Sequence, residues 1–107
     1  MSVAQQFAHV VRARALIGNH GAAFVWTTML PTEVAACAAV ELWANGSRDG
    51  LPVDTAHYAA INGVRYAPLP QATAAACRGK LIRECGDIVV GVDAVFATLV
   101  RALERGL

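Results

Sequence analysis

The chain has 107 residues, of which 56% are hydrophobic and only 16% are charged, whereas about 25% are charged in typical soluble domains. Nine basic and eight acidic residues leave a net charge of +1. This balance argues against a large phosphate-binding surface and ranks nucleic acid last among the partners considered. No apolar run reaches the roughly 18 residues that span a bilayer, so we expect no membrane partner and a cytoplasmic protein.

The same composition bears on size and assembly. A chain of this length folds around one core, so we expect a single domain over residues 1–107. A domain this small has a large surface for its volume, and its apolar excess cannot all be buried. Exposed apolar patches usually mark interaction sites, which predicts a homo-oligomer, with a dimer as the first expectation.

The first third of the chain contains two predicted elements. Residues 2–17 have apolar side chains at helical spacing and predict an amphipathic helix. The Gly18-Asn19-His20-Gly21 segment would end that helix. Residues 22–28 follow with the aromatic and β-branched content of a short strand.

Residues 32–46 predict a long central helix. Thr32 is a good N-cap and Asn45-Gly46 supplies a left-handed stop. Between the ends, Glu41 is the only strongly polar residue. Both sides of this helix should therefore be covered.

The Asn62-Gly63 pair lies between two short apolar segments and predicts a type I′ β-hairpin. Residues 71–84 then predict a helix, and residues 88–92 predict a buried strand. The order α-β-α-β-β-α-β-α indicates an α+β or small α/β fold. It would be a two-layer domain with about four helices and about four strands.

The last predicted helix covers residues 94–107 and is capped by Asp93. Its apolar stripe is predicted to contain Phe96, Leu99, Val100 and Leu103. The opposite, polar face would then contain Thr98, Arg101, Glu104 and Arg105.

Residues with catalytic or metal-binding chemistry form no recognisable pattern. The three cysteines have no CxxC spacing, which favours a reducing compartment over a disulfide framework or a zinc site. No G-x-S-x-G, H-E-x-x-H, Walker A or dinucleotide glycine motif is present. We therefore expect no catalytic residue, no metal and no cofactor, and favour a protein that is not an enzyme.

Three functions remain open. The first is a small interaction or regulatory protein that forms a homo-oligomer through an apolar helical or sheet surface, with the interface residues Val40, Trp43, Ala75, Gly79 and Ile82. The alternative is a small-ligand-binding protein or small enzyme whose pocket is lined by Trp26, Trp43, His57 and Tyr66. The third is a nucleic-acid binder that uses the cluster Arg65, Arg78, Lys80 and Arg83.

Overall fold

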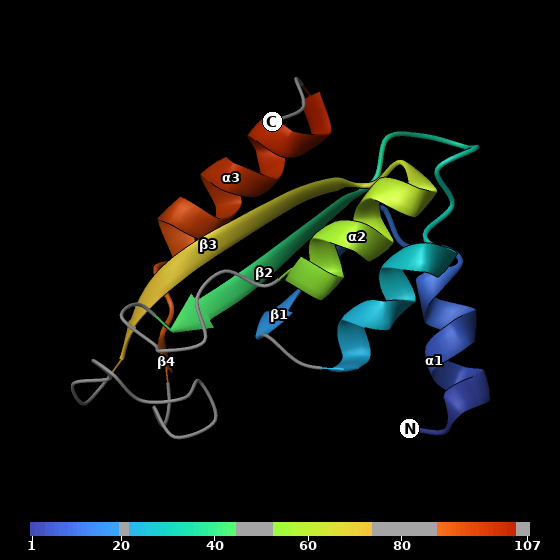
Figure 1. The fold of residues 1–107 in the computed structure, drawn as a ribbon, viewed down its shortest axis with the longest axis horizontal. Coiled ribbons are helices and arrows are strands. Elements are labelled where there is room, and N and C mark those ends of the chain that lie inside the picture. The colour runs from blue at the N-terminus through green and yellow to red at the C-terminus, as the bar shows by residue number, and fades with distance from the viewer. Residues whose placement is uncertain (20–21, 45–52, 74–87, 105–107) are drawn as a thin grey trace.

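The computed structural model describes residues 1–19, 22–44, 53–73 and 88–104 (Figure 1). Four helices pack with a sheet of mainly parallel strands, so the predicted α+β class is confirmed in its general form. In chain order the elements are the helix α1 (Val3–Val10), the strand β1 (Ala15–Asn19), the 3₁₀ helix η1 (Ala22–Met29), the strand β2 (Ala38–Ala44), the helix α2 (Val53–Asn62), the strands β3 (Arg65–Thr73) and β4 (Ile88–Val89), and the helix α3 (Val92–Glu104).

The sheet is ordered β1-β2-β3-β4 within the described residues. The first three strands are parallel, and β4 pairs antiparallel with the end of β3. Parallel neighbours need a connection that crosses over one face of the sheet. The segment containing η1 makes this connection between β1 and β2, and the segment containing α2 makes it between β2 and β3.

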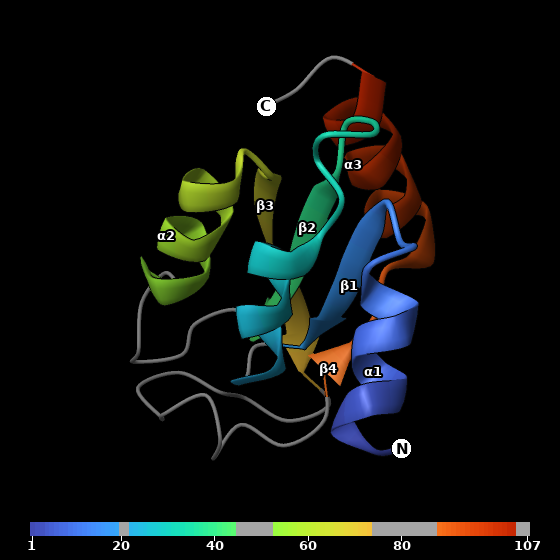
Figure 2. The same ribbon diagram turned by 90° about the vertical axis from the view of Figure 1, so that its right-hand side faces the viewer.

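The helices cover the two faces of the sheet unequally. Figure 2 shows η1 and α2 on one side of the strands and α3 on the other. On the α3 side, α3 packs mainly against β2 and β3. The helix α1 lies against η1, where the Phe7 and Trp26 ring centroids are 6.3 Å apart. The sheet therefore separates two apolar clusters.

The two clusters lie on opposite faces of β2, because successive side chains of a strand point to opposite sides. The buried residues on the η1 and α2 side are Val10, Phe24, Leu30, Cys37, Ala39, Ala59 and Val64. On the α3 side the buried residues are Val40, Leu42 and Ala67, with Leu69, Ile88, Val95 and Leu99 packed against them. Every residue of β2 is buried.

The predicted central helix over residues 32–46 is wrong. Residues 38–44 form β2, the strand between β1 and β3, and the backbone at residues 32–34 forms a turn. A strand covered on both faces is apolar throughout, as in other parallel sheets. Apolar periodicity cannot distinguish such a strand from a buried helix, and the alanines of this segment favoured the helix.

The predicted hairpin at Asn62-Gly63 is also wrong. Residues 53–62 are helical, and Gly63 ends the helix with a φ of 69°. The Val64 amide donates to the Ala59 carbonyl at 2.9 Å and the Gly63 amide donates to the Ala60 carbonyl at 3.3 Å. These two hydrogen bonds make a Schellman motif, which needs the same left-handed glycine as a type I′ turn.

Other boundaries also differ from the prediction. The first helix ends at Val10, and residues 15–19 form β1 in place of further helix. Residues 22–28 lie in the 3₁₀ helix η1 instead of a strand. Residues 71–73 end β3, and the remainder of the helix predicted over residues 71–84 lies outside the described residues.

A helix is present near the predicted last position, over Val92–Glu104. It begins before Asp93, which lies in its first turn and is not its cap, and residues 105–107 lie outside the described residues.

The buried face of α3 also differs from the expected one. Thr98 and Ala102 are buried, while Phe96 is 67% exposed. Val95 and Leu99 pack on the sheet. The buried face of α3 thus keeps Leu99 of the predicted apolar stripe but is rotated away from Phe96.

Candidate functional site

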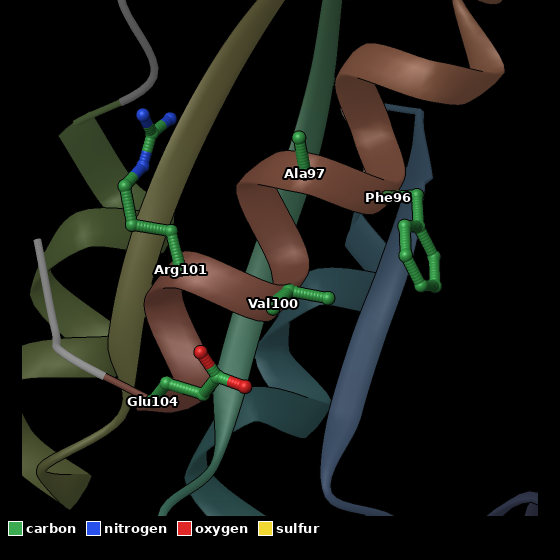
Figure 3. A pocket seen from close by; sticks show the side chains of 5 residues that line it. All are labelled: Phe96, Ala97, Val100, Arg101 and Glu104. Carbon is green, nitrogen blue, oxygen red and sulfur yellow. The ribbon is translucent and has the colours of Figure 1, made fainter.

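A hollow of about 360 Å³ lies on the outer face of α3. The described residues that line it are Phe96, Ala97, Val100, Arg101 and Glu104 (Figure 3). Their spacing places them on one face of the helix, away from Thr98 and Ala102. Figure 3 shows Phe96 and Val100 projecting to one side of α3 and Arg101 projecting to the other. The hollow therefore combines apolar side chains with a cation and an anion.

Apolar exposure continues beyond this hollow toward the start of α3. Val89, Val90 and Val92 are exposed along with Phe96. On β1, Ile17 is 43% exposed and pairs with Val40, so it lies on the same face of the sheet as α3. We define the α3 surface as the five residues of the hollow. Its exposed aromatic ring is the kind of feature that marks an interaction site.

The two charged side chains of the α3 surface have no electrostatic partner within the described residues. Arg101 and Glu104 are both exposed and are three positions apart on the same helix. No hydrogen bond or ion pair joins either side chain to another described residue.

A second polar feature is the Glu41 carboxylate, which is 0% exposed in the middle of β2. Its Oε2 accepts a hydrogen bond from the Thr55 hydroxyl at 2.9 Å, and its Oε1 accepts one from the Tyr66 hydroxyl at 2.7 Å. Thr55 lies in the first turn of α2, where the helix dipole favours negative charge. We call these three residues the Glu41 cluster. It joins β2, β3 and α2 inside the protein.

Burial is the main reason that the pKa of Tyr66 is raised above its usual value, and the hydrogen bond to Glu41 and its negative charge raise it further. The phenol therefore stays protonated and continues to donate to the carboxylate at neutral pH. Both oxygens of Glu41 thus accept hydrogen bonds from hydroxyl groups of the cluster. Its evident role is to fasten α2 to the sheet.

The raised pKa of Tyr66 predicts a loss of stability at alkaline pH. In the unfolded chain tyrosine ionises near pH 10, whereas folded Tyr66 keeps its proton to higher pH. Above about pH 10 the folded state binds more protons, so the free energy of unfolding should fall by up to about 1.4 kcal/mol per pH unit. Urea unfolding between neutral and alkaline pH should show this slope, and Tyr66→Phe should remove it. An equal slope in both proteins would contradict the assignment.

The four predicted ligand-binding residues all lie in the described part of the chain and can be placed one by one. Trp26 donates through its indole N–H to Gln6 Oε1 at 3.1 Å, and His57 is exposed on α2. Trp43 is buried in β2, and Tyr66 belongs to the Glu41 cluster. None of the four lines the hollow on α3.

The predicted interface residues divide into two groups. Val40 is 0% and Trp43 is 5% exposed, which places both in the interior of the chain. Ala75, Gly79 and Ile82 lie outside the described residues. The exposed apolar hollow that the structure describes is on α3, in a segment whose Phe96 was expected to face the core.

Of the predicted basic cluster only Arg65 can be placed. Its guanidinium donates to the Ala102 and Leu103 carbonyls at 2.8 and 2.7 Å, at the negative end of α3. Arg78, Lys80 and Arg83 lie outside the described residues. Arg65 thus serves to hold α3 on the sheet.

Cys37 is buried, and its pKa is raised chiefly by this burial, although nearby Arg14 opposes the rise. A thiol with a raised pKa is a poor nucleophile. Among residues 1–19, 22–44, 53–73 and 88–104, no group of three His, Cys, Asp or Glu side chains is placed to hold a metal ion.

The sequence signal for the Glu41 cluster was a single acidic residue inside an apolar run. The sequence-based prediction placed Glu41 in a helix and assigned it no partner.

No helix in the described part of the chain is long and apolar enough to cross a membrane. Comparison with family models, curated proteins and solved structures found no match to this chain.

Proposed function

We propose that the protein is a non-enzymatic interaction protein that forms a homodimer through the α3 surface. The observation that carries this proposal is Phe96, an aromatic side chain that is 67% exposed at an apolar hollow. Large aromatic side chains that become buried on association supply much of the binding energy of protein interfaces. A second copy of the chain would remove this ring from water.

Self-association fits the chemistry of the surface. In a two-fold dimer the same patch is used by both copies, so the patch must be complementary to itself. The α3 surface provides an apolar centre and side chains of both charges. A patch with charge of one sign only would repel its own copy.

The proposal predicts a dimer whose mass is about twice 11.2 kDa in light scattering on a size-exclusion peak. Replacing the exposed aromatic ring with a charged side chain, Phe96→Glu, should weaken dimerisation at least about tenfold, because it removes an anchor residue and places a carboxylate at the centre of the contact. A dilution series with the wild-type chain and the variant measures this change.

The matched control is Ile61→Glu, which changes an apolar residue of similar exposure on α2, across the sheet from α3. It should leave the dimer intact. A wild-type chain that remains monomeric at every concentration would rule out the proposal. A Phe96→Glu variant that dimerises as well as the control would place the interface elsewhere.

A further inference from the structure

We infer, on the basis of the proposed homodimer, that Ile17 of each copy packs into the α3 hollow of the partner subunit. Ile17 is an apolar side chain that is 43% exposed. It lies on the face of the sheet that carries α3, because it pairs with Val40 of the cluster under that helix. A two-fold dimer needs a projecting side chain and a recess on the same face of each copy, and Ile17 and the hollow supply them.

The face of β1 that carries Ile17 is not covered by α3. This helix packs mainly against β2 and β3. One helix covers about two strands of a sheet, since a helix is about 10 Å wide and neighbouring strands are about 4.8 Å apart. The strand β1 is therefore beyond the reach of α3. This accounts for the exposure of Ile17, although its neighbour Val40 is 0% exposed.

Ile17 and the hollow lie at the same level along α3. The register aligns Ile17 with Ala67 across β2, and Ala67 is two residues after Arg65, or about 6.6 Å along β3. Helix α3 runs antiparallel to β3 and ends where Arg65 contacts the Ala102 carbonyl. The same distance is about four residues of α3 before Ala102. That level is close to Leu99, which packs in the same cluster as Ala67 and lies within the span of the hollow.

A two-fold axis that runs parallel to α3, beside the hollow, preserves these levels. The two α3 helices then lie side by side between the two sheets, and Ile17 of the partner subunit meets the hollow near Ala97 and Val100. Phe96 projects from the side of α3 that faces β1, whereas Arg101 projects from the opposite side (Figure 3). The two aromatic rings therefore meet between the helices, and the two arginines are kept apart.

The variant Ile17→Glu tests this contact in the 107-residue chain. A carboxylate at the hollow would lose water without gaining a partner, so dimerisation should be at least about tenfold weaker than in wild type. The matched control is Val25→Glu, because Val25 is 46% exposed on η1, on the other side of the sheet. It should leave the dimer intact. Light scattering over a dilution series measures both variants, and circular dichroism checks that each is folded.

A second measurement uses the wild-type chain and does not depend on the folding of a variant. Dimers are assembled from equal amounts of isotope-labelled and unlabelled chains. An isotope-filtered NMR spectrum removes contacts within one copy and keeps those between copies. It should show nuclear Overhauser effects between the methyl groups of Ile17 in one copy and those of Val100 in the other.

The outcomes separate the inference from the proposed homodimer. A wild-type dimer that lacks these Overhauser effects, or a folded Ile17→Glu variant that dimerises as well as wild type, would overturn the contact of Ile17 and leave the homodimer standing. A wild-type chain that is monomeric at every concentration would overturn both.

Discussion

Val40→Asp is expected to prevent folding, with a loss of more than about 4 kcal/mol of unfolding free energy. Val40 is 0% exposed in β2 and lies in the apolar cluster under α3 with Leu42 and Ala67. The side chains that form this cluster come from β2, β3, β4 and α3 and are apolar. A carboxylate there would be buried without a partner, and the loss would use up most of the stability of a small domain.

Circular dichroism and urea unfolding of the variant measure this effect. The matched control is Val34→Asp, because Val34 is 79% exposed in the turn before β2. The control should change stability by no more than about 0.5 kcal/mol. A Val40→Asp protein with the spectrum and stability of wild type would show that β2 is not the central strand of the fold.

The second large effect is expected for Glu41→Ala, which should lower the free energy of unfolding by about 2–4 kcal/mol. The substitution removes the acceptor of two hydroxyl hydrogen bonds and leaves the Thr55 and Tyr66 hydroxyls without it. It also leaves a cavity where the carboxylate was, since Glu41 is completely buried. Denaturant unfolding at neutral pH measures the loss.

Two conservative variants divide this loss between the two hydrogen bonds. Thr55→Val removes the hydroxyl that donates to Oε2, and Tyr66→Phe removes the one that donates to Oε1. Each should cost about 1–3 kcal/mol, since each leaves one oxygen of the carboxylate with fewer donors. A Glu41→Ala protein as stable as wild type would show that the cluster does not hold α2 on the sheet.

These two predictions concern neighbouring residues on opposite faces of one strand. A carboxylate at position 41 is tolerated because two hydroxyls and the positive end of α2 meet it. A carboxylate at position 40 would lie in the apolar cluster beneath α3. The identity of the facing element, and not the strand itself, decides which polar residue can be buried.

Sequence reasoning located the two terminal helices, although the end signals at Thr32 and Asn45-Gly46 predicted a helix where the structure has β2. The helix α1 has a capping box between Ser2 and Gln5, and α3 has an acidic first turn at Asp93. A capping box and an acidic first turn depend only on residues within one helix, so the folded chain keeps them. The fold class followed from the mixture of these helices with apolar strand-like segments.

The central part of the chain could not be predicted because its signals are ambiguous. The alanines of residues 38–44 favour a helix, yet pairing with β1 and β3 on both sides makes this segment a strand. Asn62-Gly63 serves a helix end as readily as a hairpin. Pairing with distant strands decided the first case, and local hydrogen bonds at the end of a helix decided the second.

The candidate interaction surface was missed because the helix phase was assigned from hydrophobicity alone. Phe96 and Val100 were expected to face the core, but Thr98 and Ala102 lie there. A threonine and an alanine allow close approach to the strands and leave the aromatic side chain outside. Phe96 and Val100, which do not follow a simple amphipathic pattern, are therefore among the residues that we assign to the proposed homodimer contact.

The parallel register also has a consequence for how the chain reaches its fold. The pairing of β1 with β2 joins Ala15 to Ala38, and the pairing of β2 with β3 joins Ala38 to Arg65. Neither ladder can grow outward from a tight turn, so each must close a long loop before its first hydrogen bond forms. The entropy of that closure is lost before the contacts compensate for it, which makes folding slow for a chain of this length. During this interval the alanine-rich segment of β2 has no cover, and newly made chains are most prone to aggregate.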